Sequence, residues 1–146
     1  LFDAVQEGIV FFNQDGKVMD ANPAALNILG TDLSKIKGRQ LTNPAWNIVN
    51  ENGVRITDTE NPVLITLQTG NNLNNIIVGM KLPNSLRQFW ISVNTVAIYE
   101  DDADSPTKVY ATFIDITDKK LSEESVIKLR EEVADLKAKL AEKEVR

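Results

Sequence analysis

The sequence of 146 residues contains neither cysteine nor histidine. Without cysteine there is no disulfide, no thiolate nucleophile and no Cys-based metal site. Without histidine the chain lacks the residue that most often serves as general base, metal ligand or switch near neutral pH. The sequence also has no Gly-rich phosphate loop and no Ser or Lys in a nucleophile motif. We therefore expect no catalytic residues, no metal site and no enzyme activity.

Long apolar runs are missing as well. No stretch approaches the roughly 18 apolar residues of a membrane span. A composition of 42% hydrophobic and 25% charged residues is ordinary for a soluble globular protein. We expect a cytoplasmic location and no membrane contact by this piece. Because the chain begins at Leu1 rather than Met, we interpret it as part of a longer protein.

Negative charge is confined to one part of the chain. From Asp118 onward, eight Lys and Arg balance eight Asp and Glu, so the formal net charge of −5 (16 minus 21) belongs to residues 1–117. An acidic globular part repels phosphate backbones. We therefore expect no nucleic-acid partner.

The N-terminal half begins with "LFDAVQEG", whose apolar face at Leu1, Phe2 and Val5 predicts a brief lead-in helix, and then shows the signals of a hairpin and a helix. In "GIVFFNQDGKVMDA" two apolar runs flank a turn whose Asp15-Gly16 pair supplies the positive φ that tight turns need. In "NPAALNILG", Asn22 is a helix cap, Pro23 takes the first helical position and Gly30 ends the helix.

Residues 31–74 are expected to form small helices and loops. "TDLSKIKG" resembles one short helix, and a second is expected to open at Asn61-Pro62 and close at Gly70. Three β-rich runs then follow: "NIIVGMKL", "RQFWISVNTVAIY" and "KVYATFIDI". Each of the last two has one apolar lane suited to an inner face. The pattern predicts an α+β fold, an antiparallel sheet with helices on one side.

This order of segments resembles the PAS domain. The resemblance is carried by "EGIVFFNQDGKVMDANPAALNILG", "NENGVRI", "NPVLITLQTG", "RQFWISVNTV" and "YATFIDITDKK", which together cover about residues 1–120. It is closest to the sensory PAS modules of bacterial and archaeal signalling proteins, such as histidine kinases of two-component systems and diguanylate cyclases. No internal repeat is visible, so we expect a single PAS copy.

The resemblance implies a PAS fold: a five-stranded antiparallel sheet of order 2-1-5-4-3, with short helices enclosing a pocket on one face and a coiled-coil helix after it. It implies a PAS sensor domain at residues 1–117 and a signalling helix at residues 118–146. It also assigns signal coupling to Asp115, Ile116 and Thr117, which join the last strand to the helix. Asp115 or Thr117 is also suited to capping that helix.

The C-terminal segment carries a short heptad seam. Val126, Val133 and Leu140 take position a, and Leu129 and Leu136 take position d. Valine at a with leucine at d favours parallel dimers, and the charge pairs Glu132–Lys137′ and Lys139–Glu144′ would be of opposite sign in such a dimer. We predict a homodimer through this helix. The alternative is an amphipathic helix that folds back on its own domain.

The pocket candidates are residues of the inner lanes and of the helical segments. They are Leu29, Leu41, Trp46, Leu64, Leu67, Val78, Met80, Ile91, Val93, Thr95, Val109, Ala111 and Phe113. One interpretation is a cavity for a small ligand, with Thr95 as its polar contact. The other is a filled core, because any half-buried sheet shows the same alternation.

Two cofactors of the family are excluded by residue type. The absence of His excludes a His-ligated haem, and the absence of Cys excludes a Cys-adduct flavin. The cofactor is otherwise unknown, and we expect any ligand to be a small, mostly apolar or carboxylate-bearing metabolite. The acidic run Glu100, Asp101, Asp102 and Asp104 could supply oxygens to a cation, but a solvated turn is the better interpretation.

Trp90 lies in the opposite lane from Ile91 and Val93. It is therefore expected on the outer sheet face, either covered by its own chain or exposed at a surface that binds a partner.

We expect a sensory module that couples ligand or partner state to an output domain after Arg146. The competing hypotheses are a PAS relay with a filled core that only dimerises, and a partner-binding domain that uses the outer sheet face around Trp90.

Overall fold

The computed structural model describes residues 6–81 and 88–145, and within these the side chains up to Lys143. The chain forms two compact units, Leu1–Asp115 and Ile116–Arg146. Of the lead-in helix expected in residues 1–8, residues 1–5 lie outside the described residues, residues 6 and 7 form a bend, and Gly8 begins the first strand. The predicted boundary after residue 117 stays a prediction, although the structural division falls close to it.

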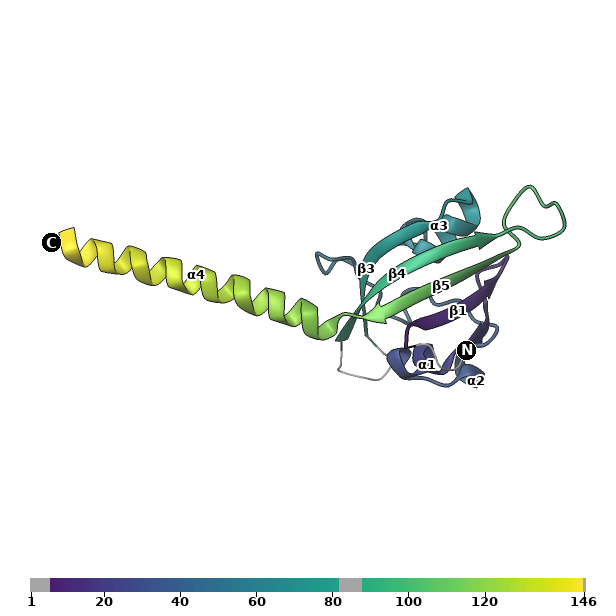
Figure 1. Cartoon of the computed structure of the whole chain (residues 1–146), viewed down its shortest axis with the longest axis horizontal. Helices are drawn as coiled ribbons and strands as arrows, with labels where there is room; N and C mark the ends of the chain where they lie inside the picture. The colour runs from purple at the N-terminus through teal and green to yellow at the C-terminus, as the bar shows by residue number, and fades with distance from the viewer. Residues whose placement is uncertain (1–5, 82–87, 146) are drawn as a thin grey trace. The chain divides into compact units, whose positions relative to one another are not determined.

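The first unit is built on one five-stranded antiparallel sheet (Figure 1). Its strands are β1 (Gly8–Asn13), β2 (Val18–Ala21), β3 (Leu73–Lys81), β4 (Gln88–Ile98) and β5 (Lys108–Asp115). Their spatial order is β2-β1-β5-β4-β3, with β1 and β4 each antiparallel to β5. This confirms the predicted order and the α+β class.

Short helices cover one face of the sheet (Figure 1). They are α1 (Pro23–Leu29), α2 (Leu33–Ile36), the 3-10 turn η1 (Asp58–Glu60) and α3 (Pro62–Thr69). Pro opens and a left-handed Gly ends both α1 and α3, at Gly30 and Gly70, as expected from the sequence.

Asn22 fixes α1 to the first strand. Its fully buried side chain accepts hydrogen bonds from the amides of Ala25 and Ile9, at 2.9 Å each, and donates one to the carbonyl of Glu7. One side chain therefore caps the helix and holds the start of β1 against it.

Both edges of the sheet are covered by loop backbone. At one edge, Val49 and Gly79 of β3 exchange two backbone hydrogen bonds, each 2.9 Å long, and Lys81 donates to the carbonyl of Trp46. At the other edge, the amide of Val18 in β2 donates to the carbonyl of Arg39. The irregular segment between α2 and η1 is therefore held by long-range backbone bonds.

The second unit is the single helix α4 (Thr117–Val145) of 29 residues. Every described side chain from Leu121 to Lys143 is exposed. No helix among the described residues is long and apolar enough to cross a membrane.

Candidate functional site: an apolar cavity and an exposed apolar stripe

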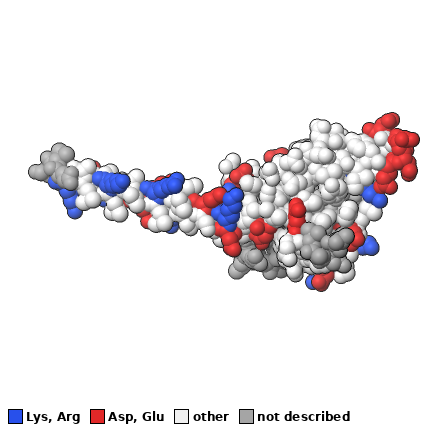
Figure 2. Space-filling model, in the orientation of Figure 1, with Lys and Arg blue, Asp and Glu red and all other residues white. Residues whose placement is uncertain are grey.

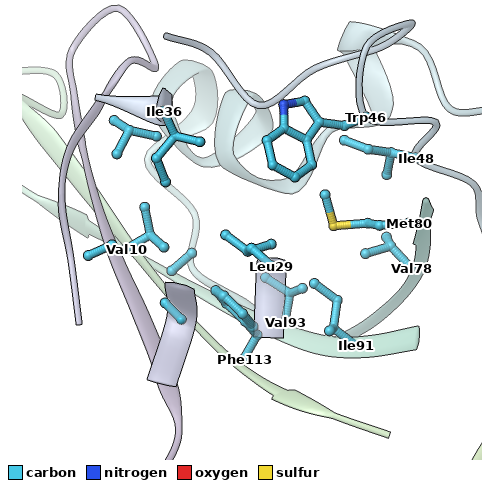
Figure 3. Close-up of a cluster of buried hydrophobic side chains, with 14 of the residues drawn as sticks. Val10, Leu29, Ile36, Trp46, Ile48, Val78, Met80, Ile91, Val93 and Phe113 are labelled. Carbon is cyan, nitrogen blue, oxygen red and sulfur yellow. The ribbon is translucent and has the colours of Figure 1, made fainter. Parts of the chain in front are cut away.

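A cavity of about 70 Å³ lies between the sheet and the helical segments. Its floor comes from β1, β3, β4 and β5, and its rim from α1, α3 and the irregular segment between α2 and η1. The lining residues are Val10, Phe12, Leu29, Leu41, Ile48, Asn61, Pro62, Val63, Val78, Met80, Ile91, Val93, Ala111 and Phe113. Figure 3 shows side chains from strands and helices converging on this interior, with the Trp46 nitrogen and the Met80 sulfur as the heteroatoms drawn.

Most of the pocket candidates from the sequence meet at this cavity. These are Leu29, Leu41, Val78, Met80, Ile91, Val93, Ala111 and Phe113. Five others lie elsewhere. Trp46 and Val109 are buried but do not line it, while Leu64 and Leu67 point their methyl groups toward Gly16 in the β1–β2 turn.

Thr95, the fifth, does not line the cavity. Its fully buried hydroxyl lies 2.6 Å from the hydroxyl of Thr66 on α3 and also accepts a hydrogen bond from the amide of Leu73. The side chain thus joins α3 to the sheet instead of offering a polar group to the cavity.

Six lining residues were not among the candidates: Val10, Phe12, Ile48, Asn61, Pro62 and Val63. Val10 and Phe12 share the alternating inner lane of β1, and that periodicity could have identified them. The other four follow from the fold of residues 41–63, where no periodicity marks an inward side.

Asn61 closes one side of the rim. Its side-chain oxygen accepts from the amide of Val63, 3.1 Å away, and so caps α3. Its side-chain nitrogen donates to the carbonyl of Leu41 at 3.2 Å. A single amide therefore ties the start of α3 to the neighbouring loop at the edge of the cavity.

The acidic run forms the loop between β4 and β5, where Figure 2 shows acidic side chains gathered at one end of the first unit. Glu100 pairs with Lys108, with 3.0 Å between Oε1 and Nζ, and accepts from the hydroxyl of Thr107. Within residues 6–81 and 88–145, no three acidic side chains are placed to hold a metal ion.

Trp90 is 8% exposed and lies outside the inner core cluster. Its ring packs over Gly79 of β3, where an added Cβ would lie 3.0 Å from the Trp90 Cζ3 atom. Trp90 is therefore buried in the single chain, as in the first of the two interpretations, while a partner surface on the outer sheet face around it stays a prediction.

The helix α4 carries the predicted seam as an exposed apolar stripe. Val126, Leu129, Val133, Leu136 and Leu140 are between 46% and 60% exposed. Acidic and basic side chains alternate along the rest of the helix (Figure 2). Glu132, Lys137 and Lys139 of the predicted charge pairs are exposed, while the side chain of Glu144 lies outside the described ones.

The strand that lines the cavity leads directly into this helix. Ala111 and Phe113 of β5 line the cavity, β5 ends at Asp115, and α4 begins at Thr117. The first backbone bond of the new helix joins the Lys120 amide to the Ile116 carbonyl at 2.8 Å. Ile116 is thus the single residue between strand and helix.

Comparison with known families and structures agrees with this architecture. Residues 1–65 match the model of a PAS domain family. No curated protein sequence matches the chain. Among solved structures, a PAS domain from Colwellia psychrerythraea is similar with a TM-score of 0.60 and 21% identity, covering 80% of this chain and 92% of that one.

Two further structures show the same fold at low identity. The PAS domain of nitrogen regulation protein NR(II) from Vibrio parahaemolyticus has a TM-score of 0.58 and 12% identity, with 79% of this chain and 94% of that one covered. A domain of a sensory box sensor histidine kinase/response regulator from Geobacter sulfurreducens has a TM-score of 0.57 and 17% identity, covering 79% and 88%. The family match over residues 1–65 and the strand order together show that the first unit has the PAS fold.

Proposed function

We propose that this PAS domain is a sensory module of a multidomain signalling protein, and that it acts by binding and coupling rather than by catalysis. One observation carries the proposal: β5 lines the inner cavity with Ala111 and Phe113 and continues through Ile116 into α4. A change in cavity packing displaces the end of β5, and Asp115, Ile116 and Thr117 pass that displacement to the helix.

The partner of α4 is a second copy of this chain in a parallel coiled coil. Its five stripe residues are spaced as a and d positions and are exposed in the single chain. Burying one such side chain contributes about 1.5–3 kcal/mol, so the stripe of two helices can offset an association cost of about 4–15 kcal/mol. In this arrangement Glu132 faces Lys137′ on both sides of the seam, and Lys139 faces Glu144′.

The output domain would follow Arg146 in the full-length protein. The Geobacter sulfurreducens structure belongs to a sensor histidine kinase/response regulator. By analogy, a kinase of a two-component system or a diguanylate cyclase is the output that a dimeric helix would control. We place the module in the cytoplasm, as the resemblance to sensory PAS modules leads us to expect.

The second candidate function is a relay that dimerises and spaces its neighbours without a ligand. It is favoured by the satisfied interior: no buried side-chain nitrogen or oxygen in the described residues lacks a hydrogen-bond partner. Native mass spectrometry of the purified chain separates the two, because a stoichiometric small molecule released on denaturation supports the sensor and contradicts the relay.

Cysteine cross-linking tests the helix pairing without background, because the chain has no cysteine. We expect Val126→Cys and Leu140→Cys, near the two ends of the seam, each to form disulfide dimers under mild oxidation. The matched control is Ile127→Cys, which is equally exposed at 55% but off the seam. Two results would contradict a parallel in-register dimer: the control cross-links as fast as the seam variants, or neither seam variant cross-links.

A further inference from the structure

The described lining of the cavity is almost wholly apolar. Asn61 is the one polar side chain among the lining residues, and both ends of its amide are already bonded, to Val63 and to Leu41. No charged side chain is among them. Among the described lining residues, therefore, no polar side chain is left without a partner for a ligand to bind.

This lining decides which ligands can gain free energy on entry. A carboxylate or a hydroxyl would lose its bonds to water and find no replacement here. Water itself needs two to four polar partners in a buried site, and apolar cavities without them stay dry. An uncharged apolar molecule loses nothing polar and gains contacts with the surrounding methyl groups and rings.

The volume indicates the size of molecule that fits between the described residues. An engineered apolar cavity of about 150 Å³ holds benzene or xenon, whereas the present one measures about 70 Å³. We propose that this cavity binds a small, uncharged, apolar molecule that is smaller than benzene. The inference rests on the proposed sensory function and names the class of its ligand.

Asn61 has a distinct part in this site as a positioning residue at the rim. Leu41 and Val63 are half-buried lining residues, and the Asn61 amide connects the backbone of one to the backbone of the other. Loss of this connection frees the loop at Leu41 from the start of α3. The amide thus limits how wide the rim opens and which molecules pass.

Xenon is a suitable probe, and methyl NMR of the full chain gives a residue-specific readout. Under xenon we expect saturable shifts of the methyl signals of Met80, Ile91, Val93 and Ala111, and unchanged signals of Ile127 and Leu136 on α4. Ala111→Val places extra methyl groups in the cavity and should abolish the xenon-induced shifts. The control Thr112→Val creates the same valine on the opposite face of β5 by exchanging a hydroxyl for a methyl group at half-buried Thr112, and it should keep the shifts.

Four outcomes overturn the proposal. Two concern xenon itself: the methyl shifts do not saturate, or the Ala111→Val variant shows the same xenon-induced shifts as the unaltered chain. Two concern other probes: butyrate shifts the same methyl signals as much as xenon does, or benzene binds as tightly as xenon. If Ala111→Val does not fold, Val93→Ile fills the same space with one methylene. Asn61→Ala should increase the rate of xenon exchange, whereas an unchanged rate removes the role assigned to Asn61.

The dimer is measured on the same samples by sedimentation equilibrium. A chain that dimerises but ignores xenon refutes the ligand class and leaves the proposed helix pairing in place. A chain that binds xenon but stays a monomer refutes the proposed helix pairing and leaves the ligand class in place.

Discussion

The hydroxyl oxygens of Thr66 on α3 and Thr95 on β4 lie 2.6 Å apart, both fully buried and 29 residues apart in the sequence. Thr95 also accepts from the amide of Leu73. Removing one hydroxyl leaves a buried partner unsatisfied, which costs about 1–3 kcal/mol.

We predict that Thr95→Val lowers the free energy of unfolding more than Thr66→Val does, because Thr95→Val also removes the hydrogen-bond acceptor of the Leu73 amide. The double variant should lose less stability than the sum of the two single losses, since it leaves no buried hydroxyl without a hydrogen-bond partner. Urea denaturation followed by circular dichroism measures all three. Additive losses would mean that the two hydroxyls do not interact in solution.

Asn22→Ala should destabilise the first unit by about 1–3 kcal/mol, because three backbone groups lose a buried partner. The control is Asn27→Ala on the same helix, where the side chain is exposed. Alanine is the better helix former there, so that variant should be neutral or slightly more stable. Equal losses in thermal or urea unfolding would remove the special role of Asn22.

Charge reversal on α4 should report the direction of pairing. Glu132→Lys and Lys137→Glu are each expected to weaken the dimer, by about 0.2–1 kcal/mol for each pair lost, and the double reversal should restore it. Sedimentation equilibrium at low salt gives the dissociation constants, and the difference should shrink as salt is raised. Failure of the double variant to recover would argue for another arrangement of the helices.

Gly8→Ala tests the route from the inner face to the helix. An added Cβ at Gly8 would lie 2.7 Å from the Phe113 Cε2 atom and 3.1 Å from the Ala25 backbone. Phe113 must therefore move, which costs about 1–3 kcal/mol and displaces the end of β5. We expect amide shifts at Ile116 to Lys120 in NMR spectra of the variant.

The matched rescue is Gly8→Ala combined with Phe113→Leu, which gives the new methyl group room. It should return the amide signals toward their original positions. Shifts that stay confined to β1 and α1 would show that β5 does not transmit the change.

Local signals explain how much of the fold could be predicted. Asp15-Gly16 and Asn61-Pro62 fix a turn and a helix start by their own backbone preferences, and both are where the sequence placed them. The order of the strands was predicted from the family resemblance. Alternation of apolar and polar residues indicates a strand, but it does not indicate which strand pairs with it.

The cavity was predicted less completely, for a physical reason. The positions of Ile48 and Asn61 depend on side-chain bonds to loop backbone, such as those from the Asn43 amide to the Ile48 carbonyl and from the Asn61 amide to the Leu41 carbonyl. No local pattern encodes such bonds. Thr95 is likewise recognisable in the sequence as a polar residue among apolar ones. Its hydrogen bond to Thr66, 29 residues away, cannot be predicted from the pattern of the strand alone.

The loop bonds at both sheet edges bear on how such modules survive at high concentration. Open strand edges recruit other chains and start aggregates. Here Val49 occupies hydrogen-bonding groups of Gly79 on β3, and Arg39 accepts from Val18 on β2. In the dimer that we propose, these bonded edges would keep two neighbouring copies from joining their strands into a shared sheet, so that each sheet stays a separate unit.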